Sequence, residues 1–329
     1  MTMPLIPDLQ PSEKNHFPIV GQLAVLTLIL GITFGSLWWF SPTRGTLSQD
    51  PNTRPTVNLQ DVEPIETPGV IENVTLNATA AYVWDVRAQR ALFKKNEKET
   101  LPLASITKLM TALVTHELIS EMTDVTLPLT AIQQEGASGL VAGETLTIEE
   151  LNELALMSSS NDAAFALANA AGALLGDRNP TQQFVAAMNI RANELQLESL
   201  AFANTTGLDL DAITPGAVGS AKDVTFLLEH IIEEYPELIL ITQEPTTRVY
   251  NSSGTYHDAE NTNAIVGRIP NLLASKTGYT DLAGGNLTVA FNLGLDRPII
   301  VTVLGSTRDA RFTDVLTLIE AVQASIVTE

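Results

Sequence analysis

The hydrophobic pattern of the chain changes twice along its length, and this change most constrains the fold. Residues Ala80–Val86 and 91–95 have the apolar alternation of a β-hairpin. The middle of the chain has the three-to-four-residue spacing of amphipathic helices. After Tyr235 alternation returns, most strictly from Leu287 to Leu293. Strands at both ends with helices between them predict an α+β fold, in which one antiparallel sheet is assembled from both ends of the chain.

Capping residues place the starts of the helices. Pro102 ends an extended stretch, so a helix is expected to begin near Ser105. Thr147 and Glu150 form a capping box for a second helix, which the serines at 158–160 should interrupt. Further helices are expected over 161–172, 181–197, 220–234 and 310–325, and late strands over 246–250, 272–276, 286–293 and 298–304.

The N-terminal part of the chain holds a run without charged residues from Phe17 to Phe40. The run is long enough to cross a bilayer as a helix, and Trp38 and Trp39 lie at its end, where aromatic rings prefer the interface. No small-residue cleavage site follows, so a retained anchor is favoured over a signal peptide. We therefore expect a short cytoplasmic tail, a transmembrane helix, a flexible Pro-rich linker and one folded domain, at residues 1–16, 17–40, 41–75 and 76–329.

Composition excludes several kinds of chemistry. The 329 residues include no cysteine, which removes disulfides, thiolate nucleophiles and Cys-ligated metals. The net charge of -20 argues against nucleic-acid binding, which needs clustered Lys and Arg. The four histidines lack metal-ligand spacing, since His116-Glu117 is followed by Ser120 where a zinc peptidase motif needs a second His. We expect no metal and no cofactor.

Three short motifs stand in order along the domain: Ser105-Ile-Thr-Lys108, Ser159-Ser-Asn161 and Lys276-Thr277-Gly278. The first two are common by chance and the third is rarer. Their joint order, with the first opening a helix and the third on a strand, matches a known set of serine acyl-transfer motifs. The three motifs together therefore indicate serine acyl-transfer chemistry, which none of them indicates alone.

The first motif has the geometry of a nucleophile and its base. Ser105 and Lys108 are three residues apart, so in a helix the amine can reach the hydroxyl. The backbone N–H of Ser105 at the helix start would stabilise an oxyanion. To act as a base, Lys108 must be neutral, so its pKa must fall by about three units from about 10.4. Burial and a second cation would lower that pKa, and Lys276 is a candidate for the cation.

The other two motifs suit a substrate peptide and its carboxylate. The Ser159 hydroxyl can relay a proton between the lysine base and a leaving amine, and the Asn161 amide can bond a peptide. Lys276 and Thr277 at a strand end offer a cation and a hydroxyl to a carboxylate, and Gly278 lets another backbone lie close. The plainer alternatives are an N-cap serine with a solvated lysine, a polar helix interruption and an exposed lysine before a turn.

With these residues in place, the sequence resembles the serine-type D-alanyl-D-alanine carboxypeptidases, the low-molecular-mass penicillin-binding proteins. The likeness covers most of residues 80–312, including LPLASITKLMTAL, GLVAGETLTIEELNELALMSSSNDAA, FANTTGLDL and ASKTGYTDLAGGNLTVAF. It implies a β-lactamase/D,D-peptidase-like antiparallel sheet with a mainly helical subdomain. It also implies acylation of a serine by a D-Ala-D-Ala stem peptide, release of D-Ala, hydrolysis of the acyl-enzyme and inhibition by β-lactams.

The resemblance also implies the role of each residue. Ser105 would be the nucleophile, Lys108 the base and Ser159 the proton relay. The oxyanion hole would be formed by the backbone N–H groups of Ser105 and Tyr279. The residues expected to bind substrate are Asn161, Lys276, Thr277, Gly278 and Tyr279.

One feature departs from the family pattern, and one role in the site is not assigned to a single residue. Ser275 follows Ala274 before the third motif, where a glycine is common in the family. Either Arg308 or Arg311 is a candidate to help hold the carboxylate.

Three other functions share part of this sequence pattern with a carboxypeptidase. A class A β-lactamase needs a Glu between the second and third motifs, but the similar stretch at 149–152 precedes Ser159. A β-lactam sensor needs a cytoplasmic output, and residues 1–16 are too few to fold alone. The closest alternative is a D,D-endopeptidase that cleaves peptide cross-links, which the sequence does not separate from a carboxypeptidase.

Because peptidoglycan lies outside the cytoplasmic membrane, we expect the folded domain on that side. The chain would then cross the membrane once, with its amino terminus inside. The expected partners are peptidoglycan stem peptides, β-lactams as inhibitors and the membrane through the N-terminal helix, with no nucleic acid. The expected biological role is in peptidoglycan biosynthesis, and so in the cell wall and cell shape.

Overall fold

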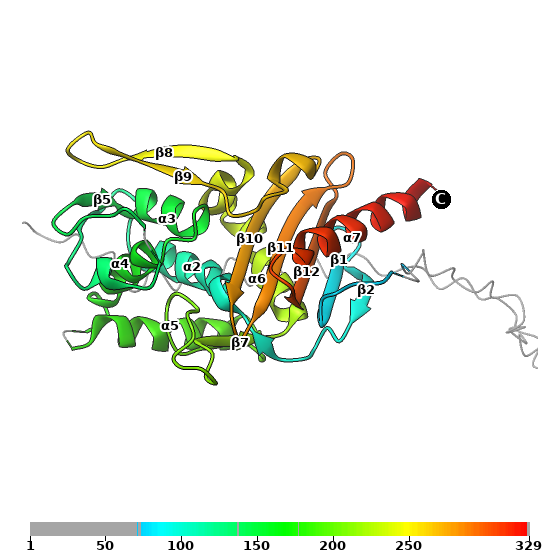
Figure 1. The fold of residues 1–329 in the computed structure, drawn as a ribbon, viewed down its shortest axis with the longest axis horizontal. Helices are drawn as coiled ribbons and strands as arrows, with labels where there is room; N and C mark the ends of the chain where they lie inside the picture. Colours follow the sequence, from blue (N-terminus) through cyan, green and yellow to red (C-terminus); the bar gives the residue numbers. More distant parts are fainter. Residues whose placement is uncertain (1–70, 72–73, 137, 177, 328–329) are drawn as a thin grey trace, which may run out of the picture. The chain divides into compact units, whose positions relative to one another are not determined.

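The computed structural model describes residues 71, 74–136, 138–176 and 178–327 (Figure 1). The expected tail, transmembrane helix and most of the linker lie outside the described residues. Within the described ranges, no helix is both long enough and apolar enough to cross a membrane.

A five-stranded antiparallel sheet forms the centre of the domain, in the order β10-β11-β12-β1-β2 (Figure 1). The N-terminal strand β1 pairs with the C-terminal strand β12, with Ala80 opposite Leu304. The sheet is therefore built from both ends of the chain, as the sequence predicts. Its strands are β1 (Ala80–Asp85), β2 (Arg90–Lys95), β10 (Leu272–Thr280), β11 (Gly284–Asn292) and β12 (Pro298–Ser306).

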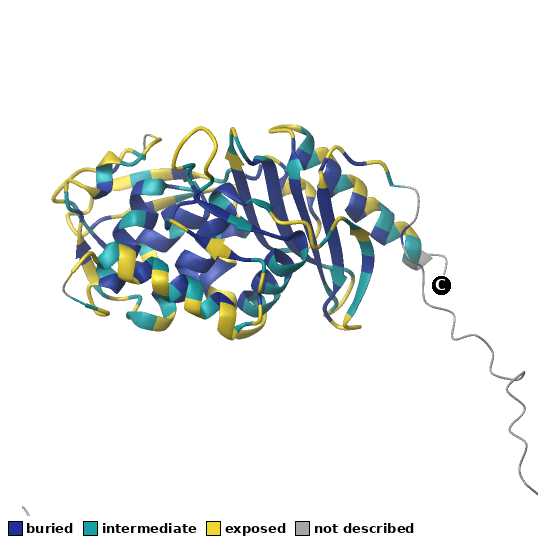
Figure 2. Ribbon diagram, turned by 90° about the horizontal axis from the view of Figure 1, so that it is seen from below, coloured by how far each residue is buried: buried dark blue, intermediate teal, exposed yellow. Residues whose placement is uncertain are grey.

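Helices cover both faces of this sheet, because its strands alternate apolar side chains between the two faces. In β11, Leu287, Val289 and Phe291 pack with the inner side of α7 (Ala310–Val327). Ala290 points the other way, into the cluster that contains the inner side of α6 (Ala221–Glu234). Figure 2 shows the strands of the sheet as buried, with exposed residues on the outer sides of the helices.

The helical subdomain lies beyond the β10 edge of the sheet (Figure 1). Its helices are α2 (Lys108–Leu118), α3 (Ile148–Leu156), α4 (Asn161–Gly172) and α5 (Pro180–Glu194). The short 3-10 helices are η1 (Ala104–Thr107), η2 (Ala131–Gln133), η3 (Pro236–Gln243) and η4 (Val266–Arg268). Small sheets complete it: β3 (Leu101–Pro102) with β7 (Ala217–Gly219) and β6 (Ala201–Phe202), β4 (Asp124–Thr126) with β5 (Thr145–Thr147), and β8 (Thr246–Tyr250) with β9 (Tyr256–Glu260).

The local capping predictions hold at two helices. Thr147 Oγ1 accepts a hydrogen bond from the Glu150 N–H at 3.2 Å, and the Glu150 carboxylate accepts one from the Thr147 N–H at 2.6 Å. Ser220 Oγ accepts from the Asp223 N–H at 3.1 Å at the start of α6. These side chains satisfy backbone donors that a helix start leaves without partners.

Three details differ from the sequence predictions. The chain at Ser105 forms a 3-10 turn, and the α-helix begins only at Lys108. The strand expected at 246–250 pairs with β9 in a separate hairpin and does not join the central sheet. The third motif lies inside β10 and not at a strand end, because β10 stays paired with β11 as far as Thr280 and Gly284.

Candidate active site

The turn that carries Ser105 is held between two glycines. Ala104 has a left-handed φ of +48°, and its carbonyl accepts a hydrogen bond from Thr107 Oγ1 at 2.7 Å. A Cβ on Gly207 would lie 1.9 Å from the Ala104 oxygen, and one on Gly278 would lie 2.7 Å from the Leu103 oxygen. Only glycine permits such close approach of backbone to backbone. The turn is therefore fixed against β10 on one side and the 204–208 loop on the other.

Lys108 lies at the bottom of the site, fully buried, with three hydrogen-bond partners. Its Nζ is 2.8 Å from Ser105 Oγ, 2.7 Å from Asn161 Oδ1 and 3.0 Å from the Thr206 carbonyl oxygen. Burial, and then the positive charge of Lys276, hold the pKa of Lys108 well below 10.5. A lowered pKa favours the neutral amine, whose lone pair can take the proton of a neighbouring hydroxyl.

The second motif forms the opposite side of the site, in the break between α3 and α4. Ser159 has a left-handed φ of +61°, and the next residue, Ser160, caps α4 by accepting from the Ala163 N–H at 3.1 Å. Asn161 is the first residue of α4, and its Nδ2 donates to the Glu135 carbonyl at 2.7 Å. The Asn161 side chain therefore connects Lys108 with the loop that follows η2.

The third motif supplies a second buried lysine. Lys276 Nζ lies 2.9 Å from Ser159 Oγ and 3.0 Å from the Thr277 carbonyl oxygen. Burial, and then the positive charge of Arg311, lower the pKa of Lys276 to about 7. The Thr277 hydroxyl lies 2.6 Å from the Thr262 hydroxyl. The site thus contains two serine–lysine pairs, one from the first motif alone and one that joins the second motif to the third.

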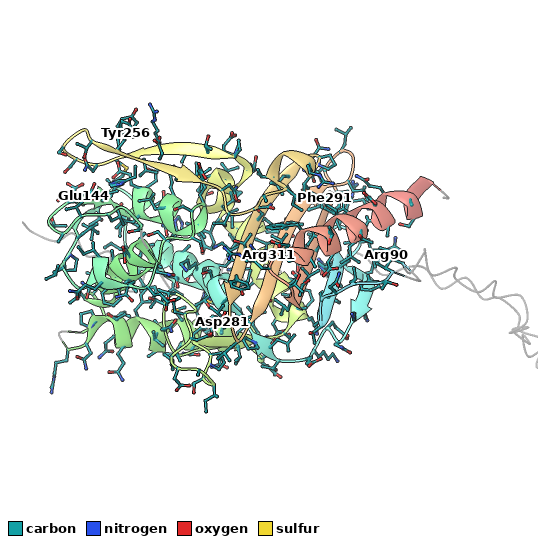
Figure 3. The ribbon with its side chains drawn as sticks, in the orientation of Figure 1. Arg90, Glu144, Tyr256, Asp281, Phe291 and Arg311 are labelled. Carbon is teal, nitrogen blue, oxygen red and sulfur yellow. The ribbon has the colours of Figure 1, made fainter. Side chains whose placement is uncertain are left out.

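Arg311 is the arginine beside the third motif. It lies near the start of α7, next to β10, and donates from one terminal nitrogen to the Gly278 carbonyl at 2.8 Å (Figure 3). Burial, and then the charge of Arg308, lower the pKa of Arg311 to about 10. Arg308 itself lies over the Tyr279 ring at 5.1 Å from its centre. Of the two arginines considered from the sequence, Arg311 is the one that contacts the backbone of the motif.

Sequence reasoning missed the backbone groups and one side chain of the site. The carbonyls of Thr206 and Glu135 and the hydroxyl of Thr262 take part in it. A backbone carbonyl has no residue type to reveal it. The available signal was Asn204, whose Oδ1 accepts from the Thr206 N–H at 3.2 Å in an Asx turn and also from the Gly207 N–H at 2.7 Å. That turn presents the Thr206 carbonyl to Lys108.

This arrangement defines the class of the protein. The parts of a serine acyl-transfer site are present: a hydroxyl beside a buried lysine whose pKa is lowered, a second hydroxyl beside a lysine with a pKa of about 7, and a strand next to the nucleophile. Within the described residues, no group of three or more His, Asp and Glu side chains is placed to hold a metal ion.

Residues 67–308 match the family model described as D-alanyl-D-alanine carboxypeptidase, peptidase family S11. The chain belongs to this family, which confirms the resemblance seen in the motifs. It is 29% identical over 236 residues to a D-alanyl-D-alanine carboxypeptidase of Bacillus subtilis, covering 69% of this chain and 58% of that protein. It is 30% identical over 234 residues to a D-alanyl-D-alanine endopeptidase of Pseudomonas aeruginosa, covering 70% of this chain and 71% of the relative.

Solved structures confirm the mixed α and β fold. Penicillin-binding protein D2 of Listeria monocytogenes, solved with ampicillin bound, is 30% identical and has a TM-score of 0.63. The match covers 76% of this chain and 98% of the Listeria chain.

Proposed function

We propose that this protein is a penicillin-binding serine D,D-carboxypeptidase that removes the terminal D-Ala from peptidoglycan stem peptides through an acyl-enzyme at Ser105. The observation that carries the proposal is the 2.8 Å contact between Ser105 Oγ and a fully buried Lys108 whose pKa is lowered. The family match and the two further motifs around the same site support it.

In the first half of the reaction, Lys108 Nζ accepts the hydroxyl proton of Ser105 while Oγ attacks the carbonyl carbon of the penultimate D-Ala. The backbone N–H groups of Ser105 and Tyr279 stabilise the oxyanion. The Ser159 hydroxyl passes the proton from Lys108 to the leaving nitrogen, and the C–N bond breaks. Terminal D-Ala leaves as an amine, and the peptide remains as an ester on Ser105.

In the second half, water attacks the ester carbonyl and gives its proton to Lys108. The ester bond breaks, the proton returns to Ser105 Oγ, and the shortened peptide leaves as a carboxylate. The Lys276 ammonium and the Thr277 hydroxyl bind the terminal carboxylate of the substrate, and Asn161 bonds its peptide group. Beside Tyr279, a cavity of about 490 Å³ offers room for the rest of the stem peptide.

We also propose that residues 17–40 anchor the protein in the cytoplasmic membrane, with residues 76–329 as the catalytic domain on the extracytoplasmic side. The uncharged run in the sequence and the location of peptidoglycan support this placement.

A D,D-endopeptidase is the second candidate function, because relatives from Pseudomonas aeruginosa and Escherichia coli carry that name and match at 30% and 29% identity. The full chain in detergent, incubated with purified monomeric and cross-linked muropeptides, separates the two functions. We expect free D-Ala from pentapeptide monomers, measured by mass spectrometry. Cleavage of cross-linked dimers with no release of D-Ala from monomers would reverse the assignment.

The pH dependence of kcat/KM should be bell-shaped. On the acid side, activity falls as Lys108 takes up a proton and can no longer accept one. On the alkaline side, activity falls as pH rises above about 7, where Lys276, buried beside the charge of Arg311, loses the proton that attracts the carboxylate. Lys276→Arg, which keeps its charge, should remove this alkaline fall, whereas Lys94→Arg on the exposed part of β2 should leave the profile unchanged. An alkaline limb that is the same in Lys276→Arg would show that another group titrates.

A further inference from the structure

One buried amide, outside the three motifs, joins the nucleophile segment to the central sheet. Asn286 lies on β11, between β10 and β12, and is fully buried (Figure 1). Its Nδ2 donates to the carbonyl oxygens of Pro102 at 2.9 Å and Leu103 at 3.0 Å. Its Oδ1 accepts from the Gly305 N–H of β12 at 2.8 Å. The nitrogen and the oxygen of this amide are therefore both used, and all three partners are backbone groups.

The sheet is irregular at this position in a way that serves the amide. The register of β11 with β12 shifts between Gly285 and Leu287, which marks a β-bulge beside Asn286. Gly305 on β12 has a left-handed φ of +65°, which glycine adopts without strain. Its N–H bonds the amide oxygen, so the amide nitrogen faces the nucleophile segment and not the reverse.

The two carbonyls that Asn286 holds lie just before the nucleophile. Leu103 is two residues before Ser105, and a Cβ on Gly278 would lie 2.7 Å from the Leu103 oxygen. Gly278 on β10 is the residue opposite Asn286 on β11. The glycine therefore sets how closely the nucleophile segment approaches β10, and the asparagine holds the segment at that distance.

This connection fixes the spacing of two backbone N–H groups. In the proposed mechanism the oxyanion is stabilised by the N–H of Ser105, in the turn, and by that of Tyr279, which follows Gly278 on β10. Each donor must lie about 2.7–3.1 Å from the position of the oxyanion. A displacement of the turn from the strand would therefore weaken at least one of the two hydrogen bonds.

We propose that Asn286 is a positioning residue for the oxyanion hole: it holds the Ser105 turn at the distance from β10 that both N–H groups require. This inference rests on the acyl-transfer function proposed for Ser105. Asn286 acts through the backbone and takes no part in proton transfer. Its loss should therefore destabilise the tetrahedral states, in which the oxyanion exists, more than the complex with substrate.

Asn286→Leu in the full chain, purified in detergent, tests the proposal, because it keeps a similar volume and removes the three hydrogen bonds. We expect kcat for release of D-Ala to fall about 10²-fold, the size of effect for a misplaced oxyanion donor. KM should change by less than about 3-fold.

The acyl-enzyme formed with penicillin gives a spectroscopic signature of the same change. In Asn286→Leu its ester carbonyl should absorb at a higher infrared frequency than in the parent, because the hydrogen bonds to the carbonyl oxygen are weaker. A loss of stability alone would not move this band.

The matched control is Asn251→Leu in the hairpin of β8 and β9. Asn251 is buried, and its Nδ2 donates to Glu144 and Thr255 side-chain oxygens, each at 2.5 Å. Its Oδ1 accepts from the Ser253 N–H at 3.1 Å. This control also removes a buried amide whose nitrogen and oxygen are both bonded. It should lower the Tm, as Asn286→Leu does, and keep the kcat and the ester band of the parent.

Asn286→Ala, measured in parallel, keeps the test decisive where the leucine variant does not fold. Water can enter the vacated space and bond the two carbonyls, so this variant should fold and lose at least about 10-fold in kcat. The proposal is overturned if a folded Asn286 variant keeps the kcat and the ester band of the parent. It is equally overturned if Asn251→Leu loses as much kcat, since the loss would then follow from stability. A parent that forms no penicillin adduct would contradict the function proposed for Ser105 instead.

Discussion

Ser105→Ala should lower kcat/KM for release of D-Ala by at least about 10⁴-fold, because the variant lacks the oxygen that forms the acyl bond. The fold should be unaffected, since Lys108 keeps its contacts with Asn161 and Thr206 when the hydroxyl is removed. Labelled penicillin should therefore form no stable adduct with a protein whose circular dichroism matches that of the parent.

The matched control for this substitution is Ser252→Ala in the exposed turn between β8 and β9. It removes a serine hydroxyl at a distance from the motifs and should keep both activity and labelling. A penicillin adduct that persists on Ser105→Ala would refute the assignment of the nucleophile.

Lys108→Met should lower kcat/KM by about 10³-fold, within the range for loss of a general base. The methionine side chain fills similar space in the buried site but cannot accept the proton of Ser105. It also leaves the Thr206 carbonyl without its donor, so we expect a loss of stability of about 1–3 kcal/mol, offset in part because a buried amine is removed. Acylation by penicillin, followed by stopped-flow fluorescence, should slow by a similar factor.

The corresponding control is Lys94→Met, which removes an exposed lysine from β2 and should leave the rate of acylation unchanged. The structure offers one rival base, since Ser159 and Lys276 form a second hydroxyl–amine pair at 2.9 Å. An acylation rate in Lys108→Met within a few-fold of the parent would transfer the role of base to that pair.

The parts of the fold that depend on local patterns were predictable from the sequence. Strict alternation in β11 and the capping box at Thr147 each depend on residues close together in the chain, and both appear in the structure. The sheet built from both ends of the chain was also predictable from where the strands fall, although the particular pairing of β1 with β12 was not. By contrast, the strand at 246–250 was assigned correctly but its partner β9 was not foreseen, because its sequence YHDAE lacks apolar alternation.

In the candidate site, too, the contacts between residues close in sequence were predictable and the contacts between distant residues were not. The spacing of Ser105 and Lys108 predicts their contact, although the chain achieves it with a 3-10 turn followed by an α-helix. The contact between Ser159 and Lys276 joins residues far apart in sequence, so it follows only from the packing of β10 against the break between α3 and α4. The left-handed backbone at Ala104 and Ser159 has no sequence signal, since neither residue type favours it.

The Asn161 side chain has a consequence for how this protein chooses its substrates. Its Nδ2 already donates to the Glu135 carbonyl, while its oxygen is held by Lys108. An amide nitrogen carries two hydrogens, so the bond to the Glu135 carbonyl leaves the second hydrogen to bond a substrate carbonyl. Because the amide oxygen and the first hydrogen are both held, the direction of the second N–H is fixed before the substrate arrives. The loop after η2 therefore helps to select peptides, since it sets the one orientation in which a substrate carbonyl can accept from Asn161.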